Sequence, residues 1–315
     1  MRAAVIVNGS LEVQDRPDPV PGTGELLVRV RAAGLNNADL IQIAGGYPAP
    51  PGWPTDIPGM EFAGEVAAVG PGVYRFKVGD RVMAVVGGGA LAELALVHER
   101  TAIAVPETVS WEAAGGFPEA FTTAHDALFT QGGLVMGERV CVHGAAGGVG
   151  VAGVQLAAAT GAQVTATVRS PELRASVEGL WPGAVTAVDP EGFDAHGPFD
   201  VILELVGAVN LASNLRALNI GGRITVIGTG AGSKGEIDLL AVMMKRARIH
   251  GSTLRARPLE QKADAAARLE KQAVPAFAAG KITVPIAGSY GLEQVNDAYA
   301  RFKAGAKFGK IVVIP

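Results

Sequence analysis

Cysteine is almost absent from this chain, because Cys141 is the only one among 315 residues. One thiol cannot form a disulfide within the chain, so no disulfide framework holds the fold together. This cysteine usage is typical of a reducing compartment, and we expect a cytoplasmic protein.

A large excess of either charge is absent as well. Lys and Arg number 27 against 30 Asp and Glu, which gives a net charge of −3. Proteins that bind nucleic acids usually carry a basic surface, so we expect no nucleic-acid partner. Hydrophobic residues make up 49% of the chain and charged residues 18%, which predicts a large buried core.

The sequence also lacks the pattern of a membrane protein. The apolar run at the N-terminus is too short for a signal peptide. Residues 140–168 contain no Asp, Glu, Lys or Arg, but glycines, glutamines and threonines divide them into short elements. We therefore expect no association with a membrane.

The clearest pattern that the sequence does contain lies in residues 139–169. An apolar run is followed by a cluster of small residues, an uncharged helical segment and a second apolar run. Strand, glycine turn, helix and strand form the first half of a dinucleotide-binding fold. The spacing is Ala145-x-Gly147-x-x-Gly150, with alanine in place of the usual first glycine. We interpret this segment as a nucleotide-binding turn rather than an ordinary tight turn.

The rest of the chain divides into two kinds of region. Residues 1–118 are rich in short apolar runs and turns, including a hairpin signal at Asn8-Gly9 and a loop with five prolines between Tyr47 and Pro58. From Ser110, an expected helix cap, apolar runs alternate with helical segments, which predicts a parallel sheet with crossover helices.

The expected elements are the following. The strands span residues 3–7, 11–13, 26–31, 61–69, 81–86, 92–97, 139–143, 163–168, 184–189, 200–205, 222–228, 248–254 and 311–314. The helices span residues 36–43, 121–130, 259–279 with an interruption at Pro275, and 291–303.

Four motifs in order carry a family resemblance: Gly34-Leu-Asn-Asn-Ala-Asp39, Pro58-Gly-Met-Glu-Phe-Ala-Gly64, Val78-Gly-Asp-Arg-Val82 and Ala145-Ala-Gly-Gly-Val-Gly150. Together they resemble the medium-chain dehydrogenase/reductase superfamily, and within it the zinc-independent quinone oxidoreductase branch. The resemblance implies an α/β protein with two domains. A GroES-like β-barrel catalytic domain would comprise residues 1–118 and 258–315, and a Rossmann domain with a doubly wound parallel sheet would comprise residues 119–257.

The resemblance also bears on metal binding. Zinc alcohol dehydrogenases hold their catalytic metal with Cys, His and Cys, and the matching positions here are Asn36, Met60 and Glu119. Only Glu119 is a good zinc ligand, and one cysteine cannot supply the four of a structural zinc lobe. We expect no metal, with Met60 packed on an apolar wall and Glu119 in a hydrogen bond or ion pair.

The end of the second dinucleotide-fold strand indicates the cofactor. An NAD enzyme needs an acidic residue there for the ribose 2′-hydroxyl, whereas this chain has Arg169 and Ser170, with Arg174 one helical turn further. Arg169 is either a solvated strand-end arginine or a donor to a 2′-phosphate. The missing acid favours the second interpretation, and NADPH is the expected cofactor.

The resemblance assigns further site residues. Asn36 is expected at the nicotinamide end of the cofactor and, with Tyr47, in catalysis, although Tyr47 is equally consistent with a loop aromatic. A second tyrosine of some members is replaced by Ile41. The remaining expected cofactor-binding residues are Thr123, Ala146, Gly147, Gly148, Val149, Leu205, Val206, Gly228 and Thr229. No histidine is assigned to catalysis.

These expectations lead to one function and two alternatives. The first is an NADPH-dependent reductase of quinones or related α,β-unsaturated carbonyls. The alternatives are a reductase of enoyl-thioester or alkenal double bonds, and an NADPH-binding protein without catalysis. By analogy with the family, residues 248–254 form an edge strand through which a homodimer extends its sheet.

Overall fold

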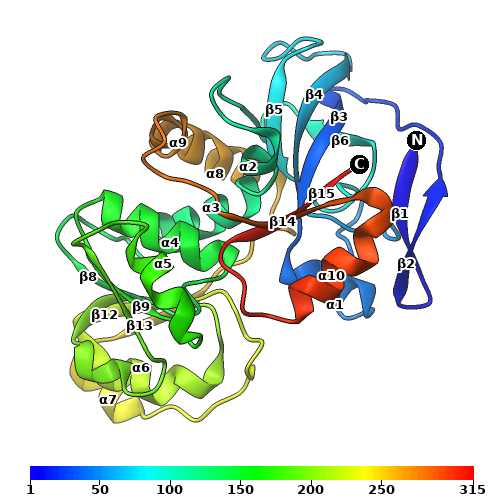
Figure 1. The fold of residues 1–315 in the computed structure, drawn as a ribbon. Coiled ribbons are helices and arrows are strands. Elements are labelled where there is room, and N and C mark those ends of the chain that lie inside the picture. The colour runs from blue at the N-terminus through cyan, green and yellow to red at the C-terminus, as the bar shows by residue number, and fades with distance from the viewer. The chain divides into compact units, whose positions relative to one another are not determined.

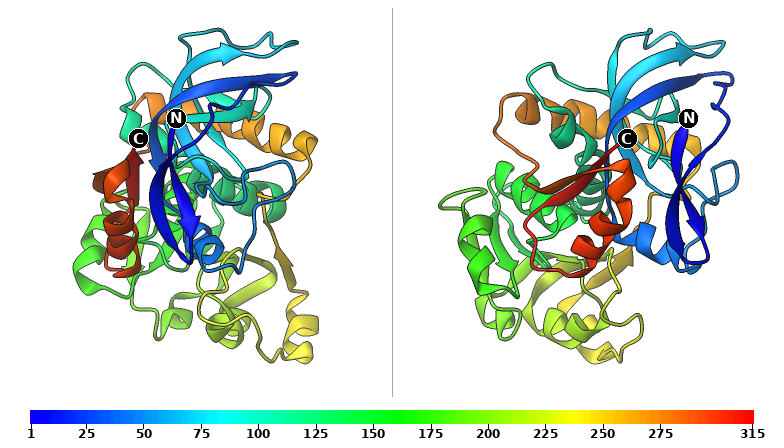
Figure 2. Two further views of the ribbon diagram at one scale, coloured as in Figure 1. Left: turned by 90° about the vertical axis from the view of Figure 1, so that its right-hand side faces the viewer. Right: turned by 45° about the vertical axis from the view of Figure 1, so that its right-hand side comes forward.

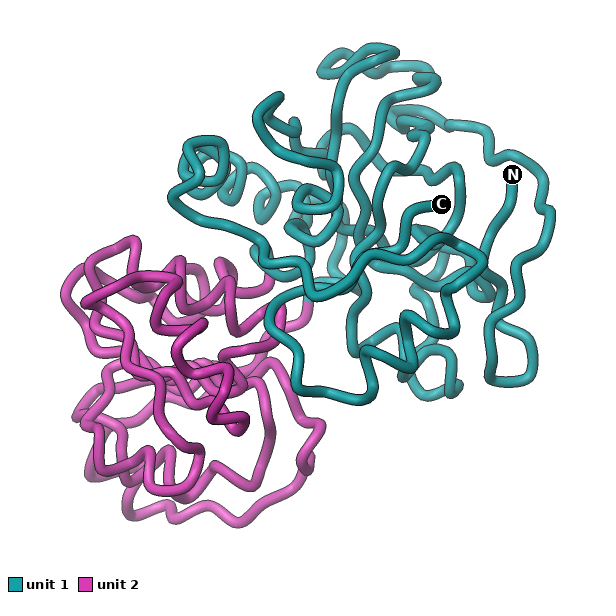
Figure 3. Tube along the Cα trace, in the orientation of Figure 1, with its two compact units in different colours: residues 1–122, 254–315 teal, residues 123–253 magenta.

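The computed structural model describes residues 1–315 and divides the chain into two compact units. Unit 1 comprises residues 1–122 and 254–315, and unit 2 comprises residues 123–253 (Figure 3). No helix is long and apolar enough to cross a membrane.

Unit 1 is built on a seven-stranded sheet in the order β14-β15-β3-β4-β5-β7, with β6 also paired to β3. Apart from the parallel pair β14–β15, the paired strands are antiparallel. The strands are β3 (Glu25–Gly34), β4 (Glu61–Val69), β5 (Arg81–Val85), β6 (Leu94–His98), β7 (Ala102–Ala104), β14 (Ile286–Gly291) and β15 (Lys310–Ile314). The antiparallel hairpin of β1 (Arg2–Val7) and β2 (Ser10–Asp15) confirms the turn predicted at Asn8-Gly9.

Alternation along β3 explains how this sheet acquires a core. Leu26, Val28 and Val30 point inward and are at most 3% exposed, whereas Arg29 and Arg31, which alternate with them, are exposed. The C-terminal strand β15, red in Figures 1 and 2, pairs with β3, blue, so the end of the chain completes the sheet that its beginning starts.

The helices of unit 1 follow the predicted signals closely. Ser110 caps α2 by accepting the backbone N–H of Ala113 (3.2 Å), and Asn36 is the N-cap of α1. The long helix predicted to the C-terminal side is interrupted before Pro275, as expected. The helices are α1 (Asn37–Ile43), α2 (Trp111–Gly115), α3 (Pro118–His125), α8 (Leu259–Gln272), α9 (Val274–Ala278), η5 (Leu292–Gln294) and α10 (Val295–Lys303).

Unit 2 contains a six-stranded, fully parallel sheet in the order β10-β9-β8-β11-β12-β13. This is the doubly wound order of dinucleotide-binding folds, and it confirms the predicted fold class. The strands are β8 (Arg139–Val142), β9 (Gln163–Thr167), β10 (Val185–Val188), β11 (Phe199–Glu204), β12 (Leu218–Val226) and β13 (Arg248–Gly251).

Short helices connect the strands of unit 2. The expected helix 121–130 changes character, because α3 ends at His125 and a π-helical turn, η1, follows it. The helices of unit 2 are η1 (Asp126–Gln131), α4 (Gly148–Ala159), η2 (Pro171–Leu173), α5 (Arg174–Glu178), η3 (Phe193–His196), η4 (Ala208–Asn210), α6 (Leu211–Ala217) and α7 (Leu239–Lys245).

Candidate functional site

The glycine turn of unit 2 leads directly from β8 into α4. Gly147 is the N-cap, and the backbone N–H groups of Gly148, Val149 and Gly150 occupy the first helical turn. Helical geometry leaves such N–H groups without an acceptor inside the helix. Their aligned dipoles favour a negative group, so this helix end can hold a pyrophosphate.

The structure explains why glycine is needed at one position of this turn and not at another. A Cβ atom at Gly150 would lie 2.4 Å from the carbonyl oxygen of Gly144, so only glycine lets the helix begin this close to the turn. Ala145 does not need to be glycine, because its φ angle is not positive and its methyl group is fully buried. Its N–H donates to the carbonyl of Thr167 (3.1 Å), which ties the turn to the end of β9.

The loops after β11 and β12 pack against each other. A Cβ at Gly228 would lie 2.1 Å from the carbonyl oxygen of Leu205, and the N–H of Ala231 donates to Val206 (2.8 Å). The structure therefore brings together Leu205, Val206, Gly228 and, one residue further, Thr229. These are the segments expected beside the ribose and nicotinamide. Thr123, also expected there, is buried near the end of α3.

The region beyond β9 holds the basic residues that were expected to bind a 2′-phosphate. Arg169 is exposed and makes no ion pair. Arg174 donates through Nε to the carbonyl of Val168 (3.2 Å) and pairs with the carboxylate of Asp189. Ser170 donates its hydroxyl to Glu172. Arg169 is thus the cation left available.

Sequence reasoning overlooked Asp189 in this region. It lies just after β10, the strand next to β9, so its sequence position carried a signal that could have placed it beside Arg174. Hydrogen bonds from the Glu191 backbone and from Arg174 lower the pKa of its carboxyl.

In unit 1, Asn36 is locked into a buried polar cluster. Its amide nitrogen donates to the carbonyl of Gly34 (3.2 Å) and to Glu61 (2.9 Å), while its oxygen accepts from the ammonium of Lys310 (2.8 Å). Both amide hydrogens are therefore used. In this arrangement Asn36 has no donor left for a substrate oxygen, so a positioning role fits it better than a catalytic one.

The Lys310 ammonium and the Glu61 carboxylate form the ion pair at the centre of this cluster. Lys310 is 4% exposed and Glu61 is fully buried. Lys310 also donates to the carbonyl of Leu35 (2.8 Å), and Glu61 accepts the backbone N–H of Glu119 (2.8 Å). Sequence reasoning missed Lys310, although a lysine directly before an apolar C-terminal strand was a usable signal.

Tyr47 is held by a second residue that the sequence did not single out, Arg255. The guanidinium of Arg255 donates to the carbonyl of Tyr47 (3.0 Å) and lies 4.9 Å from the centre of its ring. It also donates to Gly87 (2.9 Å) and to Gln42. Burial lowers the pKa of Arg255, which is only 4% exposed. The loop carrying Tyr47 is thus fixed to α1 and to the segment after β5.

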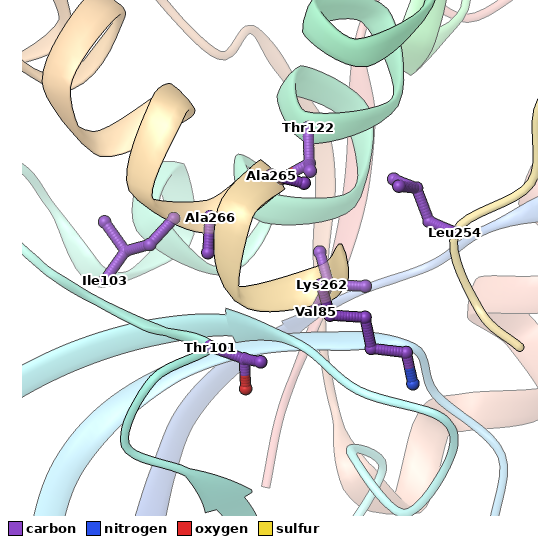
Figure 4. Close-up of a pocket in the computed structure, with 8 residues that line it drawn as sticks. All are labelled: Val85, Thr101, Ile103, Thr122, Leu254, Lys262, Ala265 and Ala266. Carbon is purple, nitrogen blue, oxygen red and sulfur yellow. The ribbon is translucent and has the colours of Figure 1, made fainter. Parts of the chain in front are cut away.

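Unit 1 contains a small pocket, and one of its lining residues, Leu254, directly precedes Arg255 in the sequence (Figure 4). Its wall is mainly apolar, with the buried hydroxyl of Thr122, which has no hydrogen-bond partner, and the stem of Lys262. The ammonium of Lys262 lies 5.5 Å from the ring centre of Trp53, and burial lowers its pKa. The lining residues are Val85, Thr101, Ile103, Thr122, Leu254, Lys262, Ala265 and Ala266.

Comparison with known proteins identifies the family. Residues 22–107 match the alcohol dehydrogenase GroES-like domain, and residues 148–271 match the zinc-binding dehydrogenase family. The quinone oxidoreductase of Homo sapiens is 31% identical over 310 residues, which cover 94% of this chain and 91% of that protein. The chain belongs to the quinone oxidoreductase-like branch of the medium-chain dehydrogenase/reductase superfamily. This superfamily binds pyridine nucleotides, and the relatives make the chain an oxidoreductase of small molecules.

Further similar proteins broaden the comparison. The acryloyl-coenzyme A reductase of Metallosphaera sedula is 30% identical over 98% of this chain and 99% of its own. A mycobacterial protein solved with NADPH has a TM-score of 0.87 at 26% identity, and all of both chains is covered. A 209-residue part of the chain is 38% identical to a polyketide synthase of Streptomyces halstedii, of which it spans 4%.

The zinc site of the superfamily has no equivalent donor set here. Both ends of the Asn36 amide are engaged, and the buried thioether of Met60 is a weak ligand for zinc. Glu119 remains as a single carboxylate, and no group of three or more His, Cys, Asp or Glu could hold a metal ion. The residues present therefore do not fit a zinc ion.

Proposed function

We propose that this oxidoreductase is an NADPH-dependent reductase of quinones and related α,β-unsaturated carbonyl compounds that works without zinc. The observation that carries the proposal is the start of α4. There, free N–H groups at Gly148 to Gly150 adjoin the packed loops of Leu205 and Gly228. A pyrophosphate at the helix end would place the ribose and nicotinamide along those loops.

Bound NADPH supplies the hydride. The residues of this chain bind and orient the cofactor, and a negative charge that develops on the substrate oxygen must be stabilised by hydrogen bonds. The Tyr47 hydroxyl is our candidate donor, because Arg255 fixes its loop. Asn36, whose amide hydrogens are both used, holds the surrounding backbone in place. Quinones and enones need less polarisation than simple ketones, which suits a site without a Lewis acid.

The preference for NADPH rests on Arg169. Of the two arginines that follow β9 closely, Arg174 pairs with Asp189, whereas Arg169 is exposed and makes no ion pair. A guanidinium suits a 2′-phosphate, with which it forms paired, charge-assisted hydrogen bonds. We expect Arg169→Ala to raise the KM for NADPH about tenfold, which corresponds to one charge-assisted contact, and to leave that for NADH unchanged. Lys271→Ala, which removes an exposed cation of α8, is the control; equal effects on both nucleotides would contradict the assignment.

A substrate panel tests the reaction itself. The purified protein is incubated with NADPH and 9,10-phenanthrenequinone, 1,4-benzoquinone, an alkenal or acryloyl-coenzyme A, and nucleotide oxidation is followed by absorbance. We expect turnover with the quinones. The similarity to an acryloyl-coenzyme A reductase favours a second candidate, reduction of an enoyl-thioester double bond, which preferential turnover of the thioester would establish. Binding of NADPH without any turnover would leave a non-catalytic nucleotide-binding protein.

We also propose a homodimer. The strand β13 is an unpaired edge of the parallel sheet, and the neighbouring helix α7 buries none of its residues. Its exposed apolar side chains include Leu239, Leu240, Met243 and Met244. Such a patch beside a free strand edge favours a partner copy. Light scattering after size-exclusion chromatography should give twice the chain mass, and Met243→Glu/Met244→Glu should give the monomer; a monomeric wild type would contradict this.

A further inference from the structure

Four buried polar side chains of unit 2 meet at the carboxyl ends of neighbouring strands. His143 follows β8, Thr167 ends β9, Glu204 ends β11, and Asn214 reaches them from α6. Each is at most 3% exposed. All four are buried, yet His143, Thr167 and Glu204 lie directly before segments that the proposed function assigns to the cofactor.

The hydrogen bonds that join Glu204, Asn214 and His143 can run in only one direction. The Glu204 carboxylate accepts, so the amide nitrogen of Asn214 must donate to it (2.8 Å). The amide oxygen of Asn214 then faces Nε2 of His143 (2.8 Å), and that nitrogen must carry the proton. Nδ1 of His143 is left to accept from the hydroxyl of Thr167 (3.1 Å). The network thus fixes a proton on Nε2, and with the Thr167 hydroxyl donating to Nδ1 the ring is neutral.

The surroundings of His143 support the neutral form. Burial lowers the pKa of its imidazole, while Glu204, 3.8 Å from Nε2, and Asn214 oppose that shift. Two other groups lie against the ring: the thiol of Cys141 (3.9 Å) and the ring of Phe193, which is perpendicular to it (4.6 Å between centroids). No Lys or Arg contacts the Glu204 carboxylate, so this buried charge is satisfied by N–H donors alone.

Both ends of the network terminate on backbone of the candidate cofactor loops. At one end Glu204 accepts the N–H groups of Val206 (2.7 Å) and Gly207 (2.9 Å). At the other end the Thr167 hydroxyl accepts the N–H of Gly144, which opens the glycine turn (3.3 Å). The network therefore links the turn at the pyrophosphate end to the loop at the nicotinamide end.

Replacing Glu204 by glutamine would cost hydrogen bonds. Four donors converge on its two oxygens: the N–H groups of Val206 and Gly207 and the side-chain amides of Asn210 and Asn214. A glutamine would turn two hydrogens toward these donors and leave at least one of them unsatisfied. The four donors compensate the buried carboxylate, and two of them are backbone N–H groups of the Val206–Gly207 loop, so the position of this loop depends on Glu204.

We propose that the Thr167–His143–Asn214–Glu204 network is a positioning device that sets the spacing between the glycine turn and the Val206–Gly207 loop, and thereby the affinity for the nicotinamide nucleotide. The proposal rests on the cofactor site of the proposed function. These four are positioning residues, because they act through the backbone of the loops.

The first test is nucleotide binding, measured by the fluorescence of NADPH. We expect His143→Leu and Glu204→Gln to raise the Kd at least tenfold, with kcat within threefold of wild type at saturating nucleotide. His143→Gln, which can donate to Asn214 and accept from Thr167, should restore most of the affinity. The control is His250→Leu, which breaks the other His–Thr hydrogen bond of this sheet, to Thr225 (2.9 Å). It should bind as wild type.

The second test needs no variant. Nitrogen-15 NMR of the wild type should show His143 neutral at pH 7 with its proton on Nε2. A proton on Nδ1, or a charged ring, would overturn the proposal, as would wild-type affinity in His143→Leu or an equal loss in His250→Leu. A wild type that binds neither NADPH nor NADH would instead refute the proposed function, and with it this inference.

Discussion

The two units bury a carboxylate in opposite ways. Glu61 of unit 1 pairs with an ammonium group 249 residues away in the sequence, that of Lys310. Glu204 of unit 2 accepts hydrogen bonds only from uncharged N–H donors, all within ten residues of it. Unit 1 thus uses a buried ion pair to connect the two chain segments from which it is built. Unit 2 satisfies its buried charge within one loop and the helix that follows it.

This difference has energetic and functional consequences. Removing one partner of a buried ion pair strongly destabilises the fold, because the other charge stays in a low-dielectric interior. The Lys310–Glu61 pair also orients Asn36, so the closure of the fold and the geometry of the candidate site depend on the same atoms. In unit 2 the fold rests on the parallel sheet, and the network that we propose acts on the candidate cofactor loops without closing the fold.

The strongest test removes the cation of unit 1. We expect Lys310→Met to lower the free energy of unfolding by about 3–5 kcal/mol, the usual cost of leaving one member of a buried pair without its partner. Urea denaturation followed by circular dichroism measures this. The double variant Lys310→Met/Glu61→Gln removes both charges and should recover at least half of the loss. A loss below about 1 kcal/mol would show that water reaches Glu61.

The next test concerns the turn of unit 2. We expect Gly150→Ala to destabilise the protein by about 1–3 kcal/mol, because its Cβ would lie 2.4 Å from the carbonyl of Gly144 and overpack the turn. The matched control is Gly147→Ala, whose Cβ would meet that oxygen at an ordinary 3.5 Å. Gly147→Ala should unfold like wild type while still weakening NADPH binding, since Gly147 is the N-cap of the helix end at which we propose that the pyrophosphate binds. Equal stability of the two variants would contradict this account of the turn.

The sequence predicts the turn of unit 2 better than the polar cluster of unit 1. The strand, turn and helix around Gly147 were predicted because their signals are local, lying within a span of about one supersecondary unit. The Lys310–Glu61 pair could not be predicted, because β15 and β3 are far apart in the sequence and become neighbours only in the folded sheet. The engagement of both Asn36 hydrogens depends on that same contact, so its expected catalytic role could not be judged from the motif.

The third prediction is a pH dependence within the polar cluster of unit 1. Burial raises the pKa of Asp39 to about 6, although the backbone N–H of Asn36 and the charge of Lys310 oppose this. The folded protein therefore holds a proton that the unfolded chain releases near pH 3.9. The stability that this proton contributes is present at low pH and is lost as the pH rises through about 6, by about 1.4 kcal/mol between pH 5 and pH 8.

Asp39→Asn isolates this contribution. The amide oxygen can still accept the N–H of Asn36, but the side chain cannot ionise. As the pH rises from 5 to 8, the wild type should therefore lose about 1.4 kcal/mol of unfolding free energy relative to Asp39→Asn. Denaturation curves for both proteins at pH 5 and pH 8 measure it, and a difference that is the same at both pH values would contradict a raised pKa.

The smallest expected effect comes from a second ion pair on the same strand as Glu61. Glu65 of β4 pairs with Arg31 of β3, and their side chains are 37% and 46% exposed. Water already solvates both charges, so Arg31→Met should cost at most about 1 kcal/mol, and less in 1 M salt. Because the two pairs share a strand and differ in burial, a loss as large as that of Lys310→Met would mean that the position on β4, rather than desolvation of the carboxylate, governs the stability of unit 1.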